Sequence, residues 1–157
     1  MDWLIELTGL AVLLVIIALV FSAYGGLPDR IPSHYDTSGA PDGYSGKSSI
    51  LVLLGITVFM AVGLFILNHF PHVFNYPMEI TAENAALQYK RATRLIRILN
   101  TITIALFSYM IYSTLQTATN EQSGLGTYFM PVFLTAMFAP IIWYFLDVYV
   151  INKSRKA

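Results

Sequence analysis

Five polar side chains that could do chemistry lie in one short stretch between two apolar segments: Arg30, His34, Asp36, Asp42 and Lys47. Histidine changes charge near neutral pH and can carry protons, and carboxylates can act as its partners in acid–base chemistry or in binding. Turn chemistry explains the same residues, because an Asp side chain caps turns and a His can bond a backbone carbonyl. We treat the five as candidate ligand-binding residues and keep both interpretations.

A single carboxylate, Asp147, stands inside another apolar segment. A charge at the centre of a bilayer costs about 2.5–3.5 kcal/mol, so this intramembrane residue requires a partner or a role. It lies about one turn from the helix end, so it could reach the membrane interface or pair with a basic residue of the inner helix such as Arg94 or Arg97. Alternatively, it could relay protons along a path of hydroxyl groups. The hydroxyl candidates for that path are Thr57, Thr101, Thr103, Ser108 and Thr135.

The remaining histidines, His69 and His72, flank Pro71. Proline disrupts the helical spacing at which two histidines share a metal, so we expect a structural pair. The chain also shows no phosphate loop, nucleophile elbow or paired zinc histidines. We therefore assign no catalytic residue, no metal site and no cofactor, and the sequence does not indicate an enzyme.

The elements that must position these residues are membrane helices. The 157 residues are 56% hydrophobic and 11% charged, against roughly 25% charged in soluble domains. A spanning helix needs about 20 mostly apolar residues. Four segments qualify, at residues 3–24, 50–68, 95–115 and 127–151. The sequence predicts an all-α fold, an integral membrane four-helix bundle that forms a single domain over residues 1–157.

The basic residues are distributed unequally between the two sides of this bundle. One side carries seven of them, namely Lys90, Arg91, Arg94, Arg97, Lys153, Arg155 and Lys156, and the other side carries Arg30 and Lys47. Cytoplasmic loops hold the excess of Lys and Arg. We therefore expect both termini in the cytoplasm and a multi-pass protein of the bacterial inner membrane. The net charge of zero gives no indication of a nucleic-acid partner.

The predicted outer loop, residues 25–49, is rich in proline and glycine at separate positions. Pro41, Asp42 and Gly43 follow the residue preferences of a type I turn, and Asp36 can cap its own turn. We expect an ordered loop on the outer membrane surface.

The predicted inner loop, residues 69–94, ends in an amphipathic helix. Small or apolar residues recur at helical spacing from Ala82, with Thr81 as the expected N-cap, and the helix should lead directly into the third span. Its basic residues, Lys90, Arg91, Arg94 and Arg97, could bind anionic lipid at about 1 kcal/mol each or contact a cytoplasmic protein partner.

Two stretches resemble a bacterial membrane family, that of the domain of unknown function 1648. In the outer loop the resemblance is carried by Leu27-Pro28, Ile31-Pro32, His34, Gly39, Pro41-Asp42-Gly43 and Lys47, and in the inner loop by the string FNYPMEITAENAALQYKRATRLIR. The family is related to the N-terminal part of Sdp-type immunity proteins. The resemblance implies a membrane location and a role in immunity or signalling.

Together these features predict a membrane protein that senses a peptide or envelope component through residues 27–47. The alternatives are a small proton-coupled transporter, a membrane enzyme that uses His34 and Asp42, and a structural accessory subunit. Membrane lipids are the expected partners, and an oligomer is left open.

Overall fold

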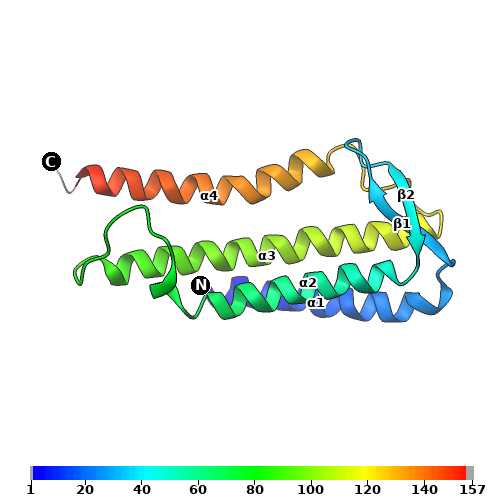
Figure 1. Cartoon of the computed structure of the whole chain (residues 1–157), viewed down its shortest axis with the longest axis horizontal. Helices are drawn as coiled ribbons and strands as arrows, with labels where there is room; N and C mark the ends of the chain where they lie inside the picture. The colour runs from blue at the N-terminus through cyan, green and yellow to red at the C-terminus, as the bar shows by residue number, and fades with distance from the viewer. Residues whose placement is uncertain (1, 155–157) are drawn as a thin grey trace.

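Four long helices form the body of the protein, and the computed structural model describes residues 2–154 of it. The helices are α1 (Asp2–Ala23), α2 (Ser49–Leu67), α3 (Ala85–Ala118) and α4 (Phe129–Ser154), and they run lengthwise side by side (Figure 1). All four are long and apolar enough to cross a membrane. The predicted fold class is confirmed, and the chain is a multi-pass membrane protein.

Helix α3 lies at the centre of this arrangement. Helices α1 and α2 pack on one side of it, α4 packs on the other, and α1 and α2 make few contacts with each other (Figure 1). Its 34 residues join the predicted amphipathic helix and the third span in one continuous helix, as expected. The tertiary structure therefore depends on α3 as the shared partner of the other three helices.

The start of α3 differs from the prediction. The helix begins at Ala85, after the cap residue Asn84, and the expected N-cap Thr81 lies outside it. The Asn84 side chain accepts a hydrogen bond from the Thr81 backbone N–H (2.9 Å) and donates one to the Glu79 carbonyl (3.0 Å). These bonds lie beside the turn at residues 82–84, and the regular helix begins only after that turn.

A β-hairpin connects α1 to α2, which the all-α prediction did not include. After the short η1 (Tyr24–Gly26), strand β1 (Arg30–Tyr35) pairs antiparallel with β2 (Pro41–Gly46), with irregular register around His34. The chain reverses at residues 36–40, where the Asp36 N–H donates to the Ala40 carbonyl (2.9 Å). The predicted turn at Pro41-Asp42-Gly43 is therefore wrong, because these residues begin the second strand.

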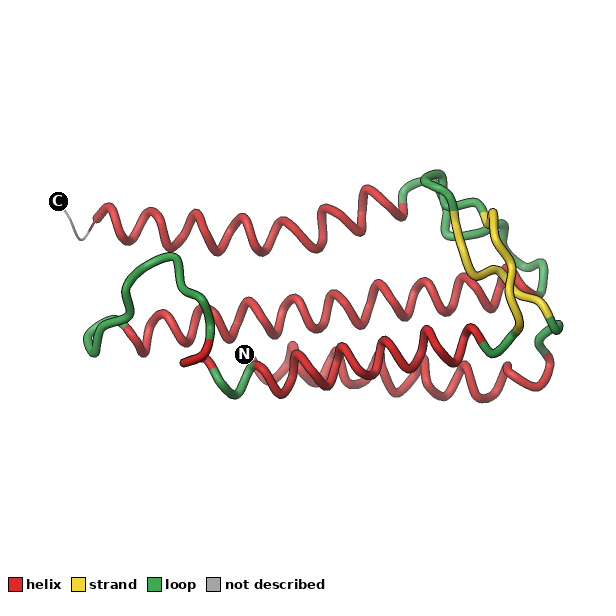
Figure 2. Tube along the Cα trace, in the orientation of Figure 1, coloured by secondary structure: helices red, strands yellow, loops and turns green. Residues whose placement is uncertain are grey.

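The hairpin closes one end of the helix bundle, and an irregular segment closes the other (Figure 2). We call the first the hairpin end, comprising residues 24–48 and 119–128. The second, which contains η2 (Pro71–Val73) and the basic residues of α3, we call the basic end and assign residues 68–97. His34 lies at the hairpin end and His69 and His72 lie at the basic end, so the length of α2 separates them.

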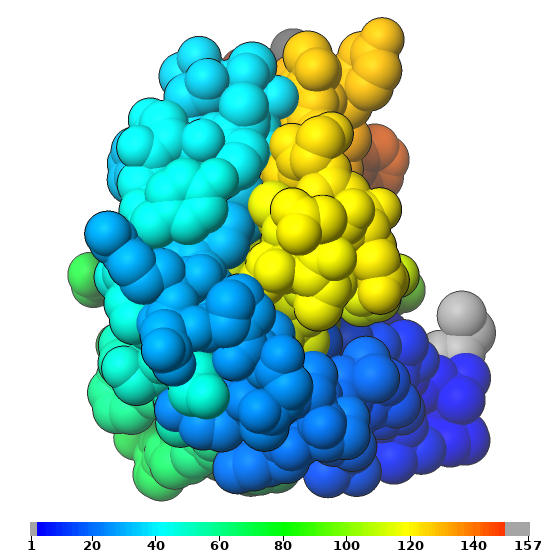
Figure 3. All heavy atoms as spheres, turned by 90° about the vertical axis from the view of Figure 1, so that its right-hand side faces the viewer, coloured from blue at the N-terminus to red at the C-terminus, as the bar shows by residue number. Residues whose placement is uncertain are grey.

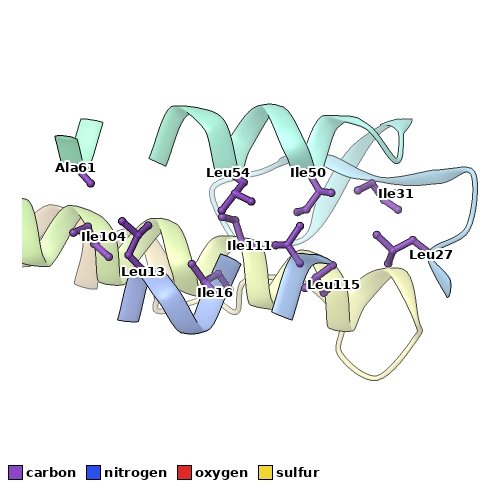
Figure 4. Packing of buried hydrophobic residues seen from close by; sticks show 11 residues of the cluster. Leu13, Ile16, Leu27, Ile31, Ile50, Leu54, Ala61, Ile104, Ile111 and Leu115 are labelled. Carbon is purple, nitrogen blue, oxygen red and sulfur yellow. The ribbon is translucent and has the colours of Figure 1, made fainter. Parts of the chain in front are cut away.

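The buried core extends from the bundle into the hairpin. Figure 4 shows the cluster, in which Leu27 and Ile31 lie near Ile50 of α2 and Leu115 of α3. Ile31 is fully buried, although it belongs to a two-stranded sheet that would be marginal alone. The hairpin therefore gains its stability from packing on the helices.

Candidate functional site

The hairpin presents one exposed pair of chemically active side chains. His34 of β1 and Asp42 of β2 face each other across the strands, with Nδ1 and Oδ1 2.5 Å apart. The side chains are 73% and 45% exposed. Among the described residues no group of three His, Cys, Asp or Glu is placed to hold a metal. The pair is suited to binding a ligand or partner from the surrounding solution.

Asp36 has a structural role in the turn between the strands. Its Oδ1 accepts hydrogen bonds from the Ser38 N–H (2.8 Å), the Ser38 hydroxyl (2.7 Å) and the Ala40 N–H (3.0 Å). These donors favour the charged carboxylate, and the Ser38 hydroxyl contributes most to lowering the pKa of Asp36 below 3.8. The expected cap by Asp36 is confirmed.

The two basic residues of the hairpin also hold it together. Arg30 donates from Nη2 to the Tyr44 carbonyl on the opposite strand (2.9 Å). Lys47 places its Nζ over the Tyr24 ring, 5.4 Å from the centroid, in a cation–π contact. Of the five residues predicted to bind a ligand, the structure thus brings His34 and Asp42 together at the surface and uses the other three to shape the hairpin.

The hairpin is fastened to the connection between α3 and α4. The Leu125 N–H donates to the Gly39 carbonyl (2.8 Å), and the space-filling view in Figure 3 shows the two segments in contact. Gly39 adopts φ +81°, and a Cβ there would lie 2.5 Å from the Gly126 oxygen. A Cβ on Gly124 would likewise overlap the Gly39 oxygen. Only glycine permits this close approach of two backbones.

A second link joins the hairpin directly to α3. The Tyr35 hydroxyl shares a hydrogen bond with the Thr114 hydroxyl (2.8 Å). Burial raises the pKa of Tyr35 above 10, because the charged phenolate would lose hydration. Tyr35 and Thr114 make the position of the His34–Asp42 pair dependent on α3.

Two ion pairs connect α3 to its neighbours at the basic end. Arg91 Nε lies 3.2 Å from Asp147 Oδ2 of α4, and Arg97 Nε donates to Glu6 Oε1 of α1 (2.7 Å). Asp147 was expected to pair with a basic residue of the inner helix, such as Arg94 or Arg97, and the structure pairs it with Arg91 of that helix. The reason is geometric, since Arg91 and Arg97 lie on different faces of one helix and therefore meet different neighbours.

These pairs change the interpretation of the four predicted lipid-binding residues. Arg91 and Arg97 are engaged within the bundle, with side chains 24% and 26% exposed. Lys90 and Arg94 belong to the exposed surface of α3. Arg94 also lines a cleft between α3 and α4, together with Asp147 and Trp143. The tail residues Arg155 and Lys156 lie outside the described part of the chain.

Two of the five hydroxyl groups considered for a proton path donate to backbone carbonyls. Thr57 donates to the Leu53 carbonyl of its own helix (2.8 Å), and Thr101 donates to the Ile5 carbonyl of α1 (3.0 Å). Their role in the structure is to satisfy carbonyls and join helices, which is the ordinary role of Ser and Thr in membrane helices.

The sequence interpretation missed a group of polar residues between α1, α2 and α3. Glu6, Asn68, Arg97 and Asn100 line one cleft there. Asn100 donates to the Ala61 carbonyl of α2 (3.1 Å). Charged or amide residues close to the ends of apolar segments were a signal for this group, but the neighbours of each depend on how the helices pack.

The first part of the chain is similar to a known family. Residues 10–58 match the family described as Domain of unknown function (DUF1648), and this range contains the whole hairpin. An uncharacterized protein of Archaeoglobus fulgidus is 26% identical over 168 residues, which cover 94% of this chain and 91% of that protein. No solved structure matches. The family resemblance of the hairpin residues is confirmed.

Proposed function

We propose that this membrane protein, whose hairpin lies in a DUF1648 segment, senses a peptide or envelope component at the hairpin end and reports it across the membrane. The observation that carries the proposal is the exposed His34–Asp42 pair on a hairpin fastened to α3. A merely connecting loop needs no such anchored, chemically active surface. Immunity and signalling roles both fit this mechanism.

The distribution of basic residues supports an outward-facing hairpin. Seven of the nine Lys and Arg residues belong to the basic end or the C-terminal tail, and two belong to the hairpin end. The excess of Lys and Arg is typical of the cytoplasmic side. In this orientation His34 and Asp42 meet extracytoplasmic ligands, and Lys90 and Arg94 meet cytoplasmic partners or anionic lipid.

Helix α3 provides the physical connection between the two sides. It carries Thr114, which contacts the hairpin, and Arg91 and Arg97, which hold α4 and α1 at the other end. A helix of 34 residues is about 51 Å long, enough to cross the membrane as one rigid element. Displacement of the hairpin by a ligand would therefore move a helix on which both ion pairs depend.

The orientation can be tested by labelling, because the chain has no cysteine. Single cysteines at the exposed positions Thr37 and Lys90 would be treated with a membrane-impermeant maleimide in intact bacterial cells. We expect Thr37→Cys to react in intact cells and Lys90→Cys to react only after permeabilisation. Equal reaction of both in intact cells would contradict the orientation.

The sensing role can be tested in a strain that lacks the protein. The strain would be complemented with the double variant His34→Ala/Asp42→Asn or with Thr37→Ala, an exposed control from the same hairpin turn. We expect the transcript profile of the double variant to match the deletion strain, and that of Thr37→Ala to match wild type at equal protein levels. Full complementation by the double variant would refute the role of the pair.

A further inference from the structure

A cleft of about 370 Å³ lies between α1 and α2, with α3 as its floor. Its walls are apolar and include Leu10, Leu13, Val62 and Phe65. Leu10, Val62 and Phe65 are each about half exposed, so the cleft opens on the surface that faces the bilayer. Ligand sites in proteins measure roughly 300–1,000 Å³, so the space suffices for an acyl chain.

The polar groups of the cleft gather at its end near the basic end. Glu6 lies in the second turn of α1, and Asn68 is the cap residue that follows α2. Leu13 stands seven residues beyond Glu6, about 10 Å deeper along the helix. The cleft is therefore polar where lipid headgroups meet hydrocarbon and apolar toward the membrane centre. A phospholipid has its polar and apolar parts in the same order.

A charge of each sign lies at the polar end. Glu6 and Arg97 form an ion pair, and their side chains remain 35% and 26% exposed. A guanidinium has five N–H donors, so one arginine can bind a carboxylate and a phosphate together. A carboxylate and a guanidinium side by side complement a headgroup that carries one positive and one negative charge. A purely anionic headgroup would be repelled by Glu6.

We propose that this cleft binds one acyl chain of an aminophospholipid from the surrounding bilayer, with the lipid phosphate against Arg97 and the lipid ammonium against Glu6. The chain fills apolar space between two helices that make few contacts with each other, and so supplies the van der Waals contacts that each helix otherwise lacks. The site goes beyond the proposed sensing function, which does not depend on it.

The experiment compares two tryptophan variants of α2. Val62 lines the cleft, whereas Val52 is a lipid-facing valine of the same helix outside it, and the two are 48% and 63% exposed. The protein would be placed in nanodiscs that contain equal amounts of phosphatidylethanolamine and phosphatidylglycerol. It would then be released into detergent, and the mass of the protein with its bound lipid would be measured by native mass spectrometry. We expect wild type and Val52→Trp to retain one phosphatidylethanolamine per chain, and Val62→Trp to lose it. Equal retention by both variants would overturn the proposal.

A substitution of Glu6 tests whether the charges of the cleft select the lipid headgroup. Glu6→Gln removes the partner of the lipid ammonium, so we expect the preference for phosphatidylethanolamine over phosphatidylglycerol to fall about tenfold, the effect of losing one charge-assisted hydrogen bond. An unchanged preference would overturn the assignment of Glu6.

A measurement on the wild-type protein tests the site without depending on whether the variants fold. Phosphatidylethanolamine with a photoreactive acyl chain should label α1 and α2 peptides around Leu10 and Val62 more strongly than α4 peptides. Uniform labelling of all four helices would show only a bulk lipid shell and would overturn the site.

Discussion

The two ends of the molecule are held together by different forces. At the hairpin end, uncharged hydrogen bonds and a close approach of backbones join the hairpin to α3 and to the segment that follows it. At the basic end, the ion pairs Glu6–Arg97 and Arg91–Asp147 join α3 to α1 and α4. The same central helix is thus fixed by backbone shape at one end and by charge at the other.

The difference follows from the shapes of the elements that meet. Packed helices lie about 8–10 Å apart, so a polar link between them needs long side chains such as Arg and Glu. A hairpin turn and a loop can approach until their backbones touch, provided that no Cβ intervenes, as at Gly39. The hairpin end should therefore respond to changes in volume, and the basic end to changes in charge.

The largest effect should come from Gly39→Ala. The new Cβ would lie 2.5 Å from the Gly126 oxygen, at a φ of +81° that favours glycine. Strain of this kind costs about 2–3 kcal/mol, and we expect unfolding in detergent to occur at correspondingly lower denaturant.

Gly25→Ala is the matched control for this change, since nothing lies within 4 Å of a Cβ at Gly25. If both alanine variants were equally stable, backbone shape would not hold the hairpin end.

A smaller effect should follow from Arg97→Gln at the basic end. The variant leaves Glu6 without its cation, and because the pair is partly exposed we expect a loss of about 1–2 kcal/mol in the free energy of unfolding. Lys90→Gln, an exposed residue of the same helix, is the control and should be near neutral. Both would be measured by chemical denaturation, and a loss as large for Lys90→Gln would show that the ion pair has no special role.

The smallest effect should come from Tyr35→Phe, which removes the hydrogen bond to Thr114 and about 1 kcal/mol. Because burial raises the folded pKa of Tyr35 above 10, its contribution is complete below pH 10 and is lost as the pH rises through the folded pKa. Wild-type stability should therefore fall more steeply above pH 10 than that of Tyr35→Phe, as followed by circular dichroism. Parallel pH profiles would contradict the assignment.

Much of the fold could be predicted from the chain because a bilayer imposes its own length scale. Helices α1, α2 and α4 lie within a few residues of the apolar segments, since about 20 apolar residues are needed to span hydrocarbon. Helix α3 contains its apolar segment and extends it with the amphipathic helix that precedes it. The hairpin was not predicted, because its core residues Leu27 and Ile31 are separated by proline and charge and show no strand alternation. Its stability comes from α2 and α3, which are distant in sequence.

The candidate site, like the fold, could be predicted from the sequence only in part. The residue types at His34, Asp36 and Asp42 identified the loop and the turn-capping role of Asp36, because these depend on near neighbours. The opposition of His34 to Asp42 depends on an irregular strand register, which no local pattern predicts.

The sequence by itself determined four membrane helices, an unequal charge distribution and a polar loop, because apolar length and charge are properties of the chain alone. The tertiary structure decided which residues meet: Arg91 with Asp147, Arg97 with Glu6, and Gly39 with Leu125. The two ion pairs depend on the rotation and register of α3 against its neighbours, and the Gly39–Leu125 bond depends on where the hairpin meets the segment after α3. Rotation and register are set by how side chains pack between helices, and hydrophobic length does not specify them.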